Sequence, residues 1–350
     1  MLNEETTRYG IRFSKKMKIL TAAVVLILIF VGTFVVLQLQ QTPSAKVKEL
    51  VIAGPPGPFT IPLAYIKEKG MLNDTVERVV IEIYENPAKL QVIVARGDAD
   101  IIVLPTCTAA LLYNKGFKVK FIGVCAWAMH YIVSDNPNVQ CLHDIKGESI
   151  AIPFNGATPD ALFSLLCQSE GLDPGKDFNL IHTASPKQAA EMILQGNVHH
   201  AILPEPLATL TILKTKAKVR KLYRVINISK AIEEKLGLKT PIAGATVSSR
   251  IENNSHLITR FLEAWEEAIV WVQENPAEAG KLAEKYLSQY GIKAKPMELA
   301  VKNIEWGFAP SWEAREDLTR YYEALLEACP NSIGGTLPDE NFYYTPESSG

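Results

Sequence analysis

The chain has 350 residues, of which 47% are hydrophobic, enough to build packed cores for two lobes of ordinary size. The net charge is −2 and the basic residues are scattered, so the sequence gives no reason to expect a nucleic-acid partner. The five cysteines lack the short paired spacing of a zinc knuckle or a disulfide framework, and they leave a single disulfide as an open alternative.

A long apolar segment lies near the amino terminus. Residues 19–39 carry no charge and follow three lysines, at positions 15, 16 and 18. We therefore expect a cytoplasmic stretch at 1–18, one transmembrane signal anchor at 19–39, a linker at 40–45 and an extracytoplasmic remainder. A cleaved signal peptide is the alternative, but Pro43-Ser44-Ala45 is a poor cleavage site, so we favour the anchor.

Strands and helices alternate after the linker. We predict strands at 48–53, 79–84 and 101–104, and helices at 60–69, at 87–96 and from Thr106. Such alternation is typical of a mostly parallel sheet with helices on its faces.

The chain changes character from Ser255 onward, where the apolar spacing becomes helical. We predict helices at 257–273, 276–290, 295–306 and 312–329, with no strand among them. They should cover a lobe, because no flexible linker separates them from the rest.

The segment from 142 to 206 contains two strand-to-helix units. The first has a strand at 149–153, a loop over residues 154–157 and a helix from Thr158, which we predict as the N-cap. The second has a helix at 186–194, a strand at 201–204 and a new helix after Glu205-Pro206. Parallel α/β sheets bind ligands at the carboxyl ends of their strands, so both loops should border one crevice.

A weak internal repeat accompanies these units. Residues 97–105 align without gaps with residues 196–204 and share a glycine, a leucine and a proline. The repeat predicts two related lobes, with residues 106–108 and Glu205-Pro206 on equivalent rims of one cleft. Two ordinary α/β units are the alternative explanation.

These motifs resemble those of a known family. The run Asp144-Ile145-Lys146-Gly147, the Gly156 loop, Glu170-Gly171-Leu172-Asp173-Pro174 and Leu203-Pro204-Glu205-Pro206 are similar to sequences in extracytoplasmic substrate-binding proteins of nitrate/sulfonate/taurine-type ABC transporters. The resemblance implies an α/β, two-lobed type II periplasmic-binding-protein fold with hinged lobes. Lobe 1 would comprise residues 46–127 plus 244–350, and lobe 2 residues 128–243.

The resemblance also implies a small-molecule solute held between the lobes by several loops. The expected ligand-binding residues are Pro58, Phe59, Thr60, Thr106, Cys107, Thr108, Trp127, Asn155, Gly156, Ala157, Thr158, Glu205 and Pro206. The chain would act as a monomer with an ABC transporter permease, at the cell membrane. We expect no catalytic residue and no cofactor. We also expect no metal, because His199 and His200 are adjacent in a strand and face opposite sides, so that both cannot easily bind one ion.

Several roles at this site stay open. Thr60 should cap the helix that it begins, and Trp127 is either a ligand platform or a core residue. Glu205 disfavours a bare anion whereas the helix N-termini favour one, so the charge of the solute is undecided.

Two other functions compete with transport. One is an enzyme of the same fold, of the pyrimidine-precursor synthase or menaquinone-pathway type. The synthase is marked by a dense cysteine cluster, whereas the cysteines here are dispersed. The other is a solute sensor that takes no part in transport.

Overall fold

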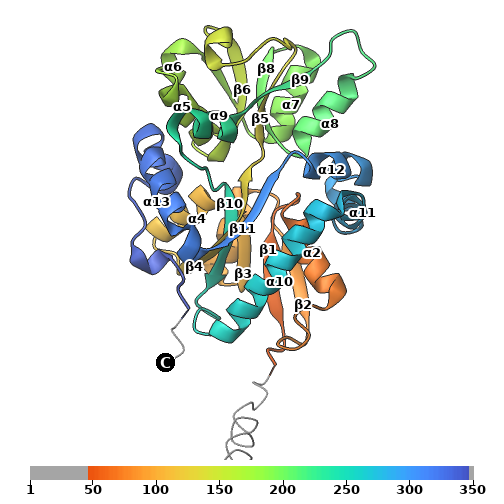
Figure 1. The fold of residues 1–350 in the computed structure, drawn as a ribbon, viewed down its shortest axis with the longest axis vertical. Coiled ribbons are helices and arrows are strands. Elements are labelled where there is room, and N and C mark those ends of the chain that lie inside the picture. Colours follow the sequence, from red (N-terminus) through yellow and green to blue (C-terminus); the bar gives the residue numbers. More distant parts are fainter. Residues whose placement is uncertain (1–45, 347–350) are drawn as a thin grey trace, which may run out of the picture. The chain divides into compact units, whose positions relative to one another are not determined.

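The computed structural model describes residues 46–346, and residues 47–346 form one compact unit (Figure 1). The predicted anchor at 19–39 lies outside the described residues. Within the described part, no helix is both long and apolar enough to cross a membrane.

The first sheet has six strands in the order β11-β4-β10-β3-β1-β2. We call this sheet and its helices lobe 1. Its strands are β1 (Leu50–Gly54), β2 (Val79–Ile83), β3 (Ile101–Pro105), β4 (Val119–Ala128), β10 (Ala243–Ser248) and β11 (Glu305–Pro310). Its helices are α2 (Thr60–Lys69), α3 (Pro87–Arg96), α4 (Thr106–Asn114), α10 (Ser255–Glu274), α11 (Pro276–Leu287), α12 (Ala294–Val301) and α13 (Ser311–Ala328).

The second sheet has five strands in the order β7-β6-β8-β5-β9. We call this sheet and its helices lobe 2. Its strands are β5 (His130–Ser134), β6 (Ser149–Pro153), β7 (Asn179–Thr183), β8 (His200–Pro204) and β9 (Tyr223–Asn227). Its helices are η1 (Leu142–Ile145), α5 (Thr158–Ser169), α6 (Pro174–Asp177), α7 (Pro186–Gln195), α8 (Leu207–Thr215) and α9 (Ile228–Leu236).

The two sheets follow the same plan. Without β11, the order β2-β1-β3-β10-β4 corresponds strand by strand to β7-β6-β8-β5-β9. In each sheet three parallel strands are followed by an antiparallel strand, β10 or β5, which is the first strand after the chain crosses from the other lobe. The preceding helices also end alike, at Gly97 with φ 66° and Gly196 with φ 82°, a left-handed conformation that glycine adopts freely. The repeat predicted from 97–105 and 196–204 is therefore present in the fold.

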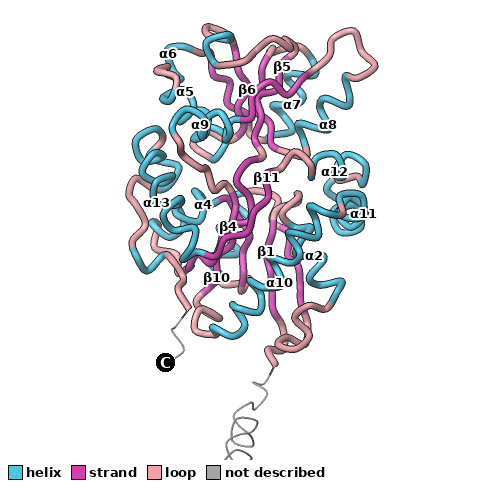
Figure 2. The backbone as a smooth tube through the Cα atoms, viewed as in Figure 1, coloured by secondary structure: helices cyan, strands magenta, loops and turns pink. Residues whose placement is uncertain are grey.

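The chain passes between the lobes at the end of β4. It enters lobe 2 between Ala128 and His130 and returns through residues 237–242 to β10. The two crossing segments are tied together, because the Thr240 hydroxyl donates to the Trp127 carbonyl over 3.1 Å and the Ile242 N–H donates to the Ala126 carbonyl over 2.9 Å. Figure 2 shows β4, β10 and β11 side by side at this junction.

The prediction of an all-helical carboxyl-terminal part is wrong at one point. Helix α12 ends at Val301, and residues 305–310 form β11, an edge strand antiparallel to β4 with two register shifts. Gly307 and Pro310 weaken the strand propensity that Trp306 and Phe308 give this segment. Pairing with the distant β4 therefore creates this strand, and the local sequence pattern does not indicate such pairing.

Candidate functional site

The amino-terminal ends of α4 and α5 meet where the lobes face each other. Each helix follows a strand of the parallel part of its sheet, β3 for α4 and β6 for α5. The Cys107 thiol of α4 lies 2.9 Å from the Thr158 hydroxyl of α5, and both side chains are buried. Two of the predicted binding residues, 51 positions apart, are thus in direct contact across the lobes.

Neither helix is capped by a side chain. Pro105 and Ala157 occupy the N-cap positions, and neither carries a side-chain acceptor. The predicted capping by Thr158 is wrong, because Thr158 is the first helical residue and its hydroxyl contacts the Cys107 thiol. The caps therefore supply no side-chain acceptor to either helix, although the Thr106 N–H of α4 donates to the Ile242 carbonyl over 3.2 Å and α5 has Asp160 in its first turn. The positive ends of two helix dipoles lie near the lobe junction.

The loop before α5 is held from within lobe 2. Phe154 has φ 59°, an unusual value for a residue other than glycine, and Gly156 has φ 74°. The Asp160 carboxylate accepts the Gly156 N–H over 2.8 Å, and its other oxygen lies 3.1 Å from the His182 imidazole. Asn155 is exposed while Ala157 is half-buried, so the loop offers both backbone and side-chain groups at the junction.

The loop between β1 and α2 is held by a hydrogen bond within the loop. Pro58, Phe59 and Thr60 are all buried. The Thr60 hydroxyl donates to the Pro55 carbonyl over 2.6 Å, so the expectation that Thr60 caps α2 is wrong. The Phe59 ring meets the Trp306 ring edge to face, with centroids 5.7 Å apart.

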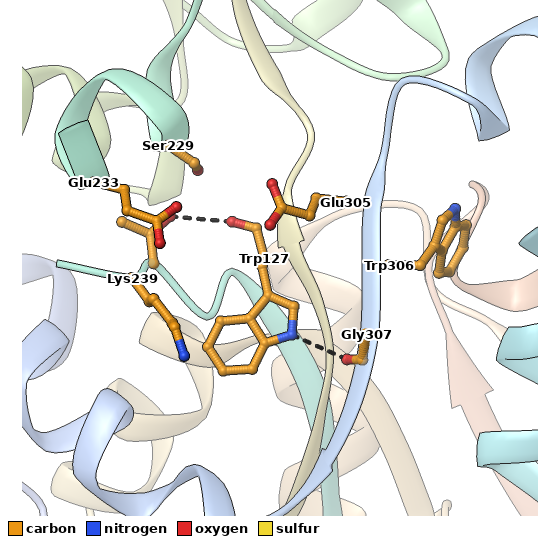
Figure 3. Close-up of a pocket in the computed structure, with 8 residues that line it drawn as sticks. Trp127, Ser229, Glu233, Lys239, Glu305, Trp306 and Gly307 are labelled. Carbon is orange, nitrogen blue, oxygen red and sulfur yellow. Dashed lines mark hydrogen bonds between the residues drawn. The ribbon is translucent and has the colours of Figure 1, made fainter. Parts of the chain in front are cut away.

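A pocket of about 360 Å³ opens between α9 of lobe 2 and strands β4 and β11 of lobe 1 (Figure 3). Of the predicted residues, Trp127 lines it, and its indole N–H donates to the Gly307 carbonyl over 3.1 Å. The Lys239 ammonium lies 5.6 Å from the centre of the Trp127 ring. The full lining is Trp127, Ser229, Glu233, Lys239, Thr240, Glu305, Trp306 and Gly307.

This pocket combines an aromatic wall with charges of both signs. The Ser229 side chain is 5% exposed and its hydroxyl has no hydrogen-bond partner. A buried hydroxyl without a partner is costly, and a solute that supplied one would remove that cost. The volume lies within the usual range of small-molecule sites, about 300–1,000 Å³.

The negative charge of Glu205 is paired with a positive charge inside lobe 2. Its side chain is buried, and its carboxylate accepts the Arg224 Nε–H over 2.8 Å and the Thr209 N–H over 3.1 Å. Burial raises the pKa of Glu205, and the Arg224 charge partly offsets that rise. Arg224 also lies 5.5 Å from the centre of the Tyr131 ring. The negative charge of Glu205 is therefore already paired within the lobe.

Three of the remaining predicted binding residues are Thr106, Thr108 and Pro206. The Thr106 hydroxyl donates to the Pro241 carbonyl of the returning crossover, whereas Thr108 and Pro206 are half-buried. His199 and His200 contact separate carboxylates, Asp135 and Glu148, each at 2.8 Å. All five cysteines are free thiols.

Several residues at the junction are not among the binding residues that the sequence predicts. His130, directly after the first crossover, is buried, and burial lowers its pKa to about 4. Its Nδ1 atom has no hydrogen-bond partner. Ser229, Glu233 and Lys239 belong to α9 and the returning segment, for which no element had been predicted. The position of His130 beside the crossover was the one available signal.

The family comparison identifies one matching model. Residues 60–279 match the model described as NMT1/THI5 like. No curated protein matches the sequence at a significant level.

Solved structures share the fold at low sequence identity. An ABC transporter structure from Parabacteroides distasonis has a TM-score of 0.71 and 22% identity, over 86% of this chain and 99% of that one. The alkanesulfonate-binding protein SsuA from Xanthomonas axonopodis pv. citri, bound to MOPS, has a TM-score of 0.62 and 14% identity, over 85% and 97%. The periplasmic nitrate-binding protein NrtA from Synechocystis has a TM-score of 0.60 and 15% identity, over 87% and 84%.

Proposed function

The chain belongs to the NMT1/THI5-like family, and from this premise we propose that it is the extracytoplasmic solute-binding component of an ABC importer. The neighbours with this fold include proteins described as sulfonate-binding and nitrate-binding. The partner would be a membrane permease, and the receptor would act as a monomer anchored by residues 19–39.

The single observation that supports the site most strongly is the contact between Cys107 and Thr158. Residues from α4 and α5, on different lobes, lie 2.9 Å apart at two helix N-termini. In our proposal the solute binds at this junction, and the lobes, divided at 127/128 and 243/244, close around it by hinge motion. The pocket at Trp127 adjoins the same junction and would admit part of a larger solute.

We propose further that the solute carries an anionic group. The pairing of Glu205 with Arg224 removes the main objection to an anion, because that carboxylate is compensated within lobe 2. The N-terminus of α4 has no side-chain cap and no acidic residue in its first turn, so it favours an anion electrostatically, whereas that of α5 already has Asp160 in its first turn. A small sulfonate, carboxylate or inorganic oxyanion fits these conditions.

A binding function is favoured over catalysis, although the same family model also covers enzymes. The Cys107 thiol is a poor nucleophile, because burial raises its pKa. We therefore assign Cys107 and Thr158 to solute binding rather than to a reaction.

A thermal-shift screen of the full chain tests this proposal. The solutes are sulfonates, nitrate, bicarbonate, amino acids and pyrimidines, each added well above its expected Kd. A solute that binds only the folded state adds about 2.7 kcal/mol of stability at a hundredfold excess over Kd. We expect an anion to raise the melting temperature, and co-purification with a permease rather than a kinase. Product formation from a screened solute would contradict the binding function.

A further inference from the structure

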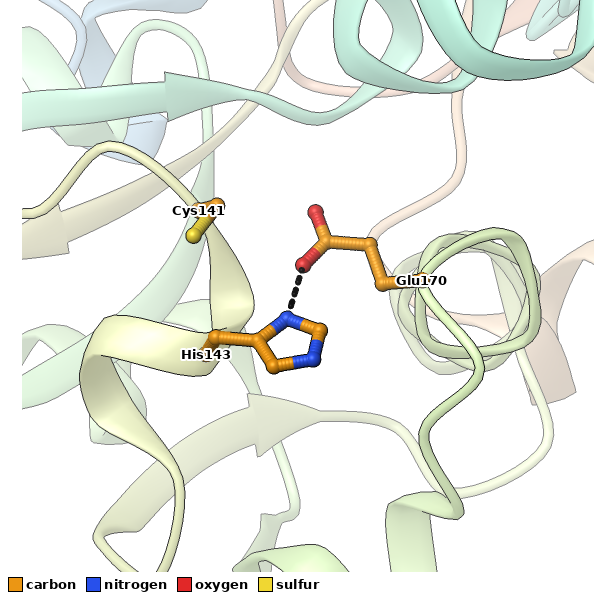
Figure 4. A group of neighbouring side chains, drawn as sticks. All are labelled: Cys141, His143 and Glu170. Carbon is orange, nitrogen blue, oxygen red and sulfur yellow. Dashed lines mark hydrogen bonds and ion pairs between the residues drawn. The ribbon is translucent and has the colours of Figure 1, made fainter.

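A second cluster of ligating side chains lies far from the lobe junction, at the opposite end of α5. Cys141, His143 and Glu170 each offer one donor atom, and the three atoms lie within 4.8 Å of one another. Cys141 and His143 flank the start of η1, and Glu170 directly follows α5 (Figure 4). Because α5 has 12 residues, this cluster lies about 18 Å from Thr158.

We propose that Cys141, His143 and Glu170 form a site for a transition-metal ion of the Zn²⁺ type. Thiolate, imidazole and carboxylate are the protein ligands of zinc, and a thiolate disfavours Mg²⁺ and Ca²⁺. Three protein ligands leave a fourth position, and His143, with 58% of its side chain exposed, leaves that position open to water.

The distances agree with a shared ion. The His143 Nδ1 atom lies 3.2 Å from the Glu170 Oε2 atom. Metal–ligand bonds of about 2.0–2.3 Å in a tetrahedral site place neighbouring ligand atoms roughly 3.3–3.7 Å apart. An ion between these atoms needs only small side-chain adjustments. It also needs the histidine tautomer with its proton on Nε2, so that the Nδ1 lone pair faces the ion.

The electrostatic setting of Glu170 favours a cation. Glu170 is the C-cap of α5, where the negative end of the helix dipole opposes a carboxylate, yet its side chain is 2% exposed. Its present partners are the Leu142 N–H at 3.0 Å, His143, and the Lys235 ammonium at 3.5 Å. Lys235 contacts Oε1, whereas Oε2 accepts the Leu142 N–H and is the oxygen that lies beside His143 Nδ1.

Binding requires one proton to leave. The Cys141 thiol must ionise to ligate the ion, and its proton passes to solvent, while His143 binds in its neutral form. The reaction involves no redox change, and it does not depend on which solute the lobe junction binds.

The test uses the full chain, kept reduced and stripped of metal by a chelator, and titrated with Co²⁺ and then with Zn²⁺. We expect a tetrahedral cobalt spectrum with a thiolate-to-cobalt charge-transfer band, which Zn²⁺ displaces. Cys141→Ser should abolish that band. Cys141→Ser and His143→Gln should each weaken Zn²⁺ binding by about 100-fold or more, because loss of even an outer-shell partner costs 10–100-fold. Lys235→Gln should tighten binding by removing the competing ammonium.

Two controls separate this site from other donors. Cys329→Ser removes another half-buried thiol, and His199→Gln removes another histidine that contacts a carboxylate. Both should keep the charge-transfer band and the Zn²⁺ affinity. The proposal is overturned if Cys141→Ser leaves the cobalt spectrum unchanged. It is also overturned if the full chain gives no cobalt spectrum at about 100 μM free Co²⁺, where a site with a Kd of about 1 μM is almost filled.

Discussion

The buried pair of Arg224 and Glu205 offers a direct test of whether Glu205 is a structural acid or a solute ligand. The change is Arg224→Met, which removes the charge and keeps most of the volume. The Glu205 side chain is fully buried and that of Arg224 is 24% exposed, so the variant leaves a buried carboxylate without its counter-charge. Breaking such a pair costs about 3–5 kcal/mol of unfolding free energy.

The loss should depend on pH in a defined direction. Burial raises the pKa of Glu205 above its value in the unfolded chain, and Arg224 opposes that rise. Without Arg224 the folded pKa rises further. A raised acid pKa means that the folded state gains stability as the pH falls from the folded pKa toward the unfolded pKa. The variant should therefore be least stable at pH 8 and recover part of the loss at pH 5.

Urea unfolding of the full chain at pH 8 and pH 5 measures this effect. Adding Glu205→Gln to Arg224→Met should restore about 2 kcal/mol at pH 8, because the amide is neutral and still accepts the Thr209 N–H. Arg78→Met, which breaks an exposed pair with Glu49, serves as the matched control and should change stability little. A loss below about 1 kcal/mol at pH 8, or the same loss at both pH values, would refute the reasoning.

Three further predictions follow from single contacts. Thr158→Val removes the hydroxyl that contacts Cys107 and should weaken binding of the solute found by thermal shift about five- to tenfold. Thr158→Ser keeps the hydroxyl and should keep the affinity; isothermal titration calorimetry measures both affinities. Phe342→Ala deletes a fully buried ring that packs on Phe121 and should cost about 3–5 kcal/mol in urea unfolding, and a loss below 1 kcal/mol would show that the carboxyl-terminal segment contributes little. Because the pKa of His130 is about 4, its folded form stays neutral, and stability is lost as the pH falls from about 6.5 toward 4. Its NMR signal should not titrate above pH 5, and titration near pH 6.5 would contradict its burial.

The sequence predicts those elements whose ends carry local signals. Helices α2 and α3 have the predicted bounds, 60–69 and 87–96, and Gly70 and Gly97 adopt left-handed backbone at their carboxyl ends. Proline begins α3, where its missing N–H costs nothing. These signals act within a few residues, so the sequence alone reveals them.

The sequence does not reveal features that depend on distant pairing. Strand β11 exists because β4 lies beside it, and the pocket at Trp127 exists because the segment returning through Thr240 crosses there. The predicted capping by Thr158 failed for the same reason. Its hydroxyl contacts Cys107, 51 positions earlier in the chain, and no local rule anticipates that contact.

The two rims that the shared sheet plan makes equivalent differ in charge. Strands β3 and β8 occupy equivalent positions, but β3 leads through Pro105 into α4 and β8 leads through Glu205 into α8. The Glu205 carboxylate accepts the Thr209 N–H in the first turn of α8, so that helix end already holds an anion from its own lobe. The cap of α4 supplies no such acceptor. If the solute carries an anionic group, α8 gives it little gain, because the Glu205 carboxylate already accepts an N–H group of its first turn. We therefore expect the anionic end to face α4, whose first turn carries no acidic residue, and the rest of the solute to extend away from it.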